Sequence, residues 1–190
     1  MEADRIKWNQ RFGSQPTYLG ERPSPFLARE MERLLRLAPG RRALDIACGE
    51  GRNSVFLAQQ GFLVTALDIS DVGLAKAARR AEEAGVTVDY RQVDLDRYHI
   101  TEQFDLIINF NFLLRDLIPG EIQALSPGGL LIIDTIMASP ALLASHNPVY
   151  LLRQGELKRT LEGMEGELLM VEELQEGEFP TARALFRKMG

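Results

Sequence analysis

Short apolar runs alternate along this chain with longer segments whose apolar residues recur at helical spacing. Five runs have the length and composition of buried strands: 43–47, 62–67, 86–93, 104–110 and 130–134. Four segments between them carry helical periodicity or helix-start signals: 26–37, 53–60, the Ala-rich stretch from Ser70 to Gly85, and 119–125. Strands that alternate with helices form βαβ units. The pattern therefore predicts an α/β fold, a Rossmann-like, doubly wound sheet that is mostly parallel.

The two ends of the chain depart from this alternation. The segment 8–25 is rich in Gly, Pro and aromatic residues and predicts an irregular lead-in. Its Trp8, Phe12 and Tyr18 suggest a lid, although packing on the sheet explains them nearly as well. At the other end, 150–161 is expected to be helical. The runs 168–173 and 183–188, joined by a Gly/Pro turn at 177–180, predict an antiparallel C-terminal hairpin at one sheet edge.

We expect one domain over residues 1–190. Within it, 1–25 forms the lead-in, 26–135 a cofactor-binding core, and 136–190 the C-terminal helix and hairpin.

The strongest chemical signal is the loop at 44–53, which reads L-D-I-A-C-G-E-G-R-N. Gly49 and Gly51 permit a tight strand-to-helix turn and let the backbone approach a ligand. The helix that follows presents free N–H groups and the positive end of its dipole. Asp45 can receive an ammonium group. The loop predicts a site for a ligand with both a carboxylate and an ammonium, and the alternative is a turn that only packs strand against helix.

Polar residues also follow the next strands, at the edge where parallel sheets bind ligands. Asp68, about twenty residues beyond the loop, is placed to bind ribose hydroxyls and to repel a 2′-phosphate. An Asp after a strand is otherwise a cap or turn residue. Asp94 could accept a hydrogen bond from the adenine amino group, with Leu95 against the ring. Asp96, two residues further on, is the alternative candidate for this role. Asn109 and Phe110 should form the floor, although Phe110 can equally be core.

Composition and charge limit the classes of partner that this protein could bind. The 190 residues are 45% hydrophobic and 26% charged, as in an ordinary globular protein, with a formal net charge of −5. A general polyanion-binding surface needs clustered Lys and Arg, so we expect no nucleic-acid partner and a small-molecule substrate. No run is long enough for a membrane span and no signal peptide is visible. The single cysteine, Cys48, cannot form an internal disulfide and suits a reducing cytoplasm. We expect a monomer or homodimer without a membrane partner.

The glycine loop, together with V-T-A-L-D-I-S, V-D-L-D, F-D-L-I-I-N-F and S-P-G-G-L-L-I-I-D, resembles the class I S-adenosylmethionine-dependent methyltransferases. The lead-in W-N-Q-R-F at 8–12 and F-P-T-A-R-A-L-F-R-K near the end are similar to the tellurite-resistance-type, small-molecule branch. The resemblance covers nearly the whole chain. It implies a seven-stranded sheet in the order 3-2-1-4-5-7-6 with the seventh strand antiparallel. It also implies S-adenosylmethionine across the strand ends and methyl transfer to a small-molecule acceptor by in-line displacement.

Twelve residues are then expected to hold the cofactor: Asp45, Ala47, Gly49, Gly51, Arg52, Asn53, Asp68, Ile69, Asp94, Leu95, Asn109 and Phe110. Ala47 replaces the first glycine of the loop, which is tolerable where its φ is negative. The fourth strand ends N-F-N-F and lacks the N-P-P-Y/F signature of base and glutamine methyltransferases.

Catalytic groups are sparse. The sulfonium is already activated, so we expect no metal and no covalent enzyme intermediate. Cys48 should point into the sheet as a small hydrophobe. His146, Asp116 and Arg115 are weak candidates for a base or a substrate contact, and none is assigned. A non-catalytic S-adenosylmethionine-binding module and an NAD-dependent oxidoreductase remain as alternatives.

Overall fold

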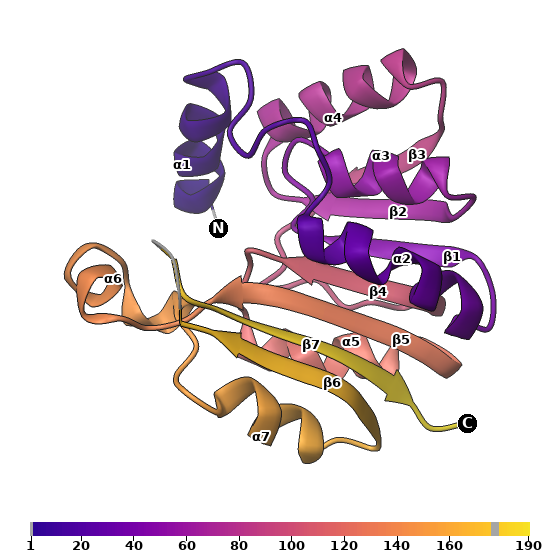
Figure 1. The fold of residues 1–190 in the computed structure, drawn as a ribbon. Coiled ribbons are helices and arrows are strands. Elements are labelled where there is room, and N and C mark those ends of the chain that lie inside the picture. The colour runs from indigo at the N-terminus through magenta and orange to yellow at the C-terminus, as the bar shows by residue number, and fades with distance from the viewer. Residues whose placement is uncertain (1, 176–178) are drawn as a thin grey trace.

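The computed structural model describes residues 2–175 and 179–190. Within them seven strands form one sheet in the order β3-β2-β1-β4-β5-β7-β6 (Figure 1). The strands are β1 (Arg42–Ile46), β2 (Leu63–Asp68), β3 (Val88–Gln92), β4 (Phe104–Phe110), β5 (Leu125–Ile136), β6 (Gly166–Leu174) and β7 (Thr181–Lys188). β1 to β5 pair in parallel, whereas β7 is antiparallel to both β5 and β6. The predicted Rossmann-like fold and its antiparallel C-terminal hairpin are confirmed.

Helices cover both faces of the sheet. They are α1 (Glu2–Gly13), α2 (Pro25–Leu37), α3 (Arg52–Gln59), α4 (Asp71–Glu83), α5 (Ile118–Gln123), α6 (Pro140–Ser145) and α7 (Glu156–Glu162), with 3₁₀ turns η1 (Arg115–Leu117) and η2 (Pro148–Tyr150). Two apolar clusters result. One contains side chains of α2 and α3, and the other contains side chains of α5 and α7. None of the described helices is both long and apolar enough to cross a membrane.

Side chains of β4 alternate between these two clusters. Ile108 and Phe110 lie in the cluster with α2, and Ile107 lies in the cluster with α5. Parallel strands end at a common edge, where α1 and α6 also lie (Figure 1). The candidate site is at this edge.

The start of the chain differs from the prediction. Residues 8–13, expected to be irregular, belong to α1. The stretch has little apolar periodicity of its own. It is stabilised as a helix by packing against α4 and by the rings of Trp8 and Phe12, which stack at 5.5 Å.

The helix expected over 150–161 begins only at Glu156. Arg115 donates hydrogen bonds to the carbonyl oxygens of Val149 and Leu151, at 2.5 and 2.9 Å. The prediction of a helix before Glu156 is wrong, because a side chain from another element binds carbonyl groups that a helix would use for its own hydrogen bonds. α6 was not predicted at all.

Two further details concern the last strands. β5 begins at Leu125 rather than after the Gly pair, and its register against β4 shifts in this region, where Gly128 has a φ of 76°. The turn predicted at 177–180 lies partly outside the described residues.

Candidate functional site

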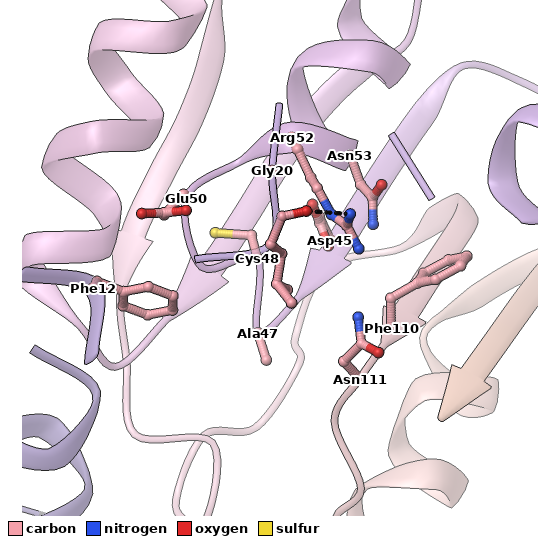
Figure 2. Close-up of a pocket in the computed structure, with 11 residues that line it drawn as sticks. Phe12, Gly20, Asp45, Ala47, Cys48, Glu50, Arg52, Asn53, Phe110 and Asn111 are labelled. Atoms are coloured by element: carbon pink, nitrogen blue, oxygen red, sulfur yellow. Dashed lines mark hydrogen bonds between the residues drawn. The ribbon is translucent and has the colours of Figure 1, made fainter. Parts of the chain in front are cut away.

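A small cavity of about 30 Å³ opens between the ends of β1 and β4 and the lead-in. Figure 2 shows Phe12 and Glu50 on one side of it and Phe110 and Asn111 on the other. The lining residues are Phe12, Leu19, Gly20, Asp45, Ala47, Cys48, Glu50, Arg52, Asn53, Phe110 and Asn111. Five of the twelve residues expected at the cofactor site are thus brought together here.

Asp45 is the buried acid of this cavity. It is 2% exposed, and its Oδ2 accepts a hydrogen bond of 2.5 Å from Oγ of Ser54. Burial raises the pKa of Asp45 to about 7, while the Ser54 bond opposes the rise. Asp45 therefore changes its charge near neutral pH, and in its ionised form it can receive an ammonium group.

Ala47 adopts a left-handed backbone conformation with a φ of 53°. The condition for a tolerable alanine, a negative φ, is therefore not met, because the turn out of β1 keeps the geometry that a glycine would use. Among the described residues only Ala47 and Asn111, with a φ of 56°, combine a side chain with a positive φ. Such a conformation costs about 1–2 kcal/mol per residue. Both border the cavity, which is where backbone strain commonly accompanies function.

The two loop glycines serve different purposes. A Cβ on Gly51, whose φ is 73°, would lie 2.6 Å from Cβ of Ala77 and 2.8 Å from Oη of Tyr90. Gly51 therefore allows close packing of α4 and β3 against the loop, and it does not line the cavity.

Gly49 instead faces the lead-in. A Cβ on it would lie 3.1 Å from the ring of Phe12, and one on Gly73 would lie 3.0 Å from the same ring. The two glycines form a cradle for Phe12.

Asp68 lies next to this loop and is 6% exposed. Its Oδ2 accepts from the backbone N–H of Gly49 and its Oδ1 from that of Ser70, each at 2.8 Å. Burial raises the pKa of Asp68, and these two bonds oppose the rise. Each carboxylate oxygen has a second acceptor position, so Asp68 can still bind a hydroxyl.

Three other predicted residues do not line the cavity. The carbonyl of Ile69 accepts from Nε2 of Gln92 at 3.1 Å. Leu95 is buried in the core. Asp94 is half-buried, and its Oδ1 accepts from the backbone of Asp96 at 3.2 Å.

Asn109 is also absent from the cavity lining, contrary to expectation. Strand alternation turns it to the α5 face, where its Nδ2 donates to Oε1 of Glu121 at 2.8 Å. Phe110 lines the cavity, and the centroid of its ring lies 6.2 Å from that of Phe26. Sequence reasoning missed Asn111, the residue that lies in the cavity beside Phe110.

The lead-in crosses this edge as a strap, here defined as residues 13–24. Lys76 of α4 holds its start, donating to the carbonyls of Phe12, Gln15 (2.7 Å) and Pro16 (3.2 Å). The same ammonium contacts Oε1 of Glu50 at 3.0 Å.

Side chains from the glycine loop and α3 hold the rest of the strap. Glu50, 6% exposed, accepts from the backbone N–H of Tyr18 at 2.7 Å. Arg52 donates to the carbonyl of Leu19 at 2.8 Å. Asn53 accepts from the backbone N–H of Ser24 at 2.9 Å. Arg52 and Asn53, predicted as cofactor residues, thus anchor the strap while lining the cavity. Glu50 and Lys76 were missed, because one acid and one lysine carry no sequence signal of a distant backbone partner.

The aromatic residues of the lead-in form one cluster. The ring of Phe12 lies 5.8 Å from that of Tyr18, and Trp8 lies 6.2 Å from Tyr18. Because Phe12 borders the cavity, the cluster covers the glycine loop.

None of the three candidate catalytic residues lines the cavity. His146 is exposed at the end of α6, with Nδ1 2.9 Å from Oγ of Ser145. Arg115 forms an ion pair with Glu156 at 2.5 Å and thereby holds the segment before α7. Asp116 is exposed on η1.

Cys48 borders the cavity and also packs against the core beside α2. Burial and the nearby carboxylates of Asp45 and Asp68 raise the pKa of its thiol well above 9. The thiol is therefore protonated and a poor nucleophile at neutral pH. Across residues 2–175 and 179–190, no three metal-ligating side chains are grouped to hold an ion.

Comparison with known proteins adds independent findings. Residues 43–129 match the methyltransferase domain family. The ubiquinone biosynthesis O-methyltransferase of Pseudomonas entomophila is 32% identical over 123 residues, which cover 60% of this chain and 53% of that protein. The matched stretch thus spans about half the length of that relative.

Solved structures share the fold over most of the chain. Magnesium protoporphyrin IX methyltransferase from Synechocystis, determined with bound S-adenosylhomocysteine, superposes with a TM-score of 0.73 at 15% identity and covers 98% of each chain. TehB from Haemophilus influenzae gives a TM-score of 0.69 at 21% identity, covering 95% of this chain and 67% of its own. Residues 43–129 are thus similar to the methyltransferase domain family, and the chain shares the fold of solved methyltransferases. These likenesses are of fold alone, so the tellurite-resistance-type branch stays a prediction.

Proposed function

We propose that this protein transfers a methyl group from S-adenosylmethionine to a small-molecule acceptor. The observation that carries the proposal is the strand-tip arrangement: a glycine loop tied to Asp68 at 2.8 Å, with the buried acid Asp45 in the adjoining cavity. This donor and acceptor set fits the cofactor. Asp45 suits its ammonium, Asp68 suits its ribose hydroxyls, and the left-handed loop at Ala47 leaves room for close backbone approach.

We propose three further cofactor-binding residues from their position in the fold. Ile69, Asp94 and Leu95 follow β2 and β3 at the same sheet edge, where an adenine ring would lie. Phe110 ends β4, Asn111 follows it, and both would face the acceptor. When bound, S-adenosylmethionine supplies a methyl group already activated by its sulfonium. The work left to the chain is orientation and exclusion of water.

We propose that the strap opens for ligand entry. The cavity of about 30 Å³ has room for only a water molecule or two. Sites for nucleoside-sized ligands are on the order of several hundred Å³. Phe12, Leu19 and Gly20 line the cavity on the side of the lead-in, so outward movement of residues 13–24 would enlarge the site. This proposal develops the lid suggested by the aromatic residues of the lead-in.

The acceptor is proposed to be a small molecule bound without a nucleic-acid or membrane partner, by a monomer or homodimer in the cytoplasm. The formal charge of −5 and the single cysteine support this. Two of the proteins compared here are named for methyl transfer, and the ubiquinone-pathway relative is named as an O-methyltransferase. Oxygen acceptors therefore come first among those to test.

Titration calorimetry with S-adenosylmethionine, S-adenosylhomocysteine and NAD tests the cofactor. We expect heat with the first two and none with NAD; heat with NAD alone would support the oxidoreductase instead. Turnover of labelled methyl groups is then measured on phenol, carboxylate, amine, thiol and oxyanion acceptors. Tight cofactor binding with no transfer to any acceptor class would favour the non-catalytic binding module.

A further inference from the structure

A buried carboxyl group is paired with an amide near the tip of β4, on the α5 face of the sheet. Nδ2 of Asn109 donates to Oε1 of Glu121 at 2.8 Å. Glu121 is 0% exposed and Asn109 is 2% exposed. The other oxygens of the same groups, Oδ1 of Asn109 and Oε2 of Glu121, are also buried and have no hydrogen-bond partner in the described part of the chain. Two acceptors are left over on two side chains that already share one bond.

An ionised Glu121 cannot satisfy these atoms, because a carboxylate and an amide oxygen both only accept hydrogen bonds. A protonated carboxyl group presents one donor and one acceptor, and so does the edge of a primary amide that faces it. Acid and amide are therefore complementary through two parallel hydrogen bonds. One proton on Oε2 of Glu121 would supply a donor of the kind that Oδ1 of Asn109 lacks.

The surroundings of Glu121 also favour the neutral form. α5 buries it together with Ile118 and Ile122, which belong to the apolar cluster on this face. Burial raises the pKa of Glu121 to about 7, and the opposing influence is the bond from Asn109. Among the described residues no charged group contributes to the shift. A buried carboxyl without a cationic partner keeps its proton.

The pair lies directly behind the candidate site. Asn109 pairs in the sheet with Ile46, which precedes Ala47 of the loop. The two residues after Asn109, Phe110 and Asn111, border the cavity. A fixed side chain at Asn109 therefore holds the end of β4 at the place where the cavity begins.

We propose that Glu121 is held as a neutral carboxylic acid in the folded protein, and that its two-point pair with Asn109 positions the tip of β4. Glu121 is a positioning residue that acts through Asn109. The protonation of Glu121 is argued from its burial and its contacts, whereas the consequence for ligand binding rests on the proposed function.

The experiment compares urea unfolding of the wild type and Glu121→Gln between pH 4.5 and 8. A glutamine keeps both bonds to Asn109, and its spare N–H imposes a cost that is constant with pH. A carboxyl with a raised pKa in the folded state loses stability as pH rises from its ordinary value of 4.5 to about 7. We expect the folding equilibrium constant of the wild type to fall on the order of a hundredfold relative to Glu121→Gln across this window.

If the stability of the two proteins changed with pH in the same way, the proposal that Glu121 is a neutral acid would be wrong. Infrared difference spectroscopy of Asp45→Asn decides the same point if Glu121→Gln does not fold, because Asp45→Asn lacks the other buried carboxyl group whose pKa is about 7. A protonated carboxyl band at pH 6 that disappears above pH 8 supports the proposal, and its absence at pH 6 contradicts it.

The positioning role is read from S-adenosylhomocysteine affinity. Glu121→Gln should bind within about twofold of the wild type, whereas Glu121→Ala, which leaves Asn109 unpaired, should bind at least tenfold more weakly. Equal affinity in Glu121→Ala would remove the positioning role. If the wild type binds no S-adenosylhomocysteine, the proposed function fails, while the unfolding profiles still decide the protonation of Glu121.

Discussion

The backbone N–H of Gly49 donates a hydrogen bond of 2.8 Å to Oδ2 of Asp68. This bond joins the loop after β1 to the tip of β2, so the acid expected to bind ribose also fixes the turn expected to hold the rest of the cofactor. Asp68 accepts a second backbone bond from Ser70, the N-cap of α4. A single carboxylate thereby sets the relative positions of two loops and a helix.

Asp68→Ala should weaken S-adenosylhomocysteine binding by about 1–3 kcal/mol, the scale for removing a partner from buried hydrogen-bonding groups. Ligand analogues separate ribose binding from loop support. If Asp68 binds the hydroxyls, a 2′,3′-dideoxy analogue binds the wild type more weakly than the parent ligand, and this difference vanishes in the variant. Calorimetry with both ligands measures it, with a melting curve as the control for folding. A difference that persists in Asp68→Ala would assign the carboxylate to loop support only.

Cofactor affinity should rise with pH through the ionisation of Asp45. Burial raises its pKa to about 7, so about a tenth of the group is ionised at pH 6 and about nine tenths at pH 8. If the ionised form receives the cofactor ammonium, binding strengthens about tenfold across this range.

Stability should change in the opposite direction. The pKa of Asp45 in the folded protein lies above its ordinary value of 3.8, so its contribution falls as pH rises from 3.8 to about 7 and is constant above that. Asp45→Asn keeps an acceptor for Ser54 and serves as the control for both measurements. A variant that retained the full pH dependence of binding would exclude Asp45 as its source.

Gly51→Ala should destabilise the fold by about 2–4 kcal/mol. The added Cβ meets Ala77 and Tyr90 at 2.6 and 2.8 Å, and it also pays the strain of a φ of 73°. Gly85→Ala is the matched control, because its φ is 66° but no atom lies within 4 Å of the added Cβ. Urea unfolding of the two variants isolates the packing contribution. Equal losses in both would show that α4 and β3 accommodate the methyl group.

Lys76→Met should release the strap while leaving the sheet intact. The variant removes the ammonium that binds three lead-in carbonyls and Glu50. We expect faster amide hydrogen exchange in residues 13–24 and faster dissociation of S-adenosylhomocysteine. The loss of global stability should be only about 1 kcal/mol, because the opening is local. Arg79→Met, at an exposed position on the same helix, is the control. Unchanged exchange at Tyr18 would show that Glu50 and Arg52 hold the strap without Lys76.

The strand–helix alternation, the glycine loop and the acids at the strand tips could be recognised from local pattern. Each depends on residues close together in the sequence: a run of apolar residues makes a strand, and two glycines permit a turn. β4 was expected over 104–110 and is found there, and the helix expected from Ser70 is α4, with Ser70 as its N-cap. The same local reasoning failed at residues 8–13, whose helix depends on α4, sixty residues away.

What the sequence by itself determined is the fold class, the sheet edge at which the candidate site lies, and the position of Asp45 and Asp68 at that edge. Only the tertiary structure decided which side chains share that edge. Arg52 and Asn53 bind the strap, Asn109 faces α5, and Asn111 takes the place in the cavity. The physical reason is that periodicity assigns a residue to a face of its own element, whereas its hydrogen-bond partners are set by where the other elements pack.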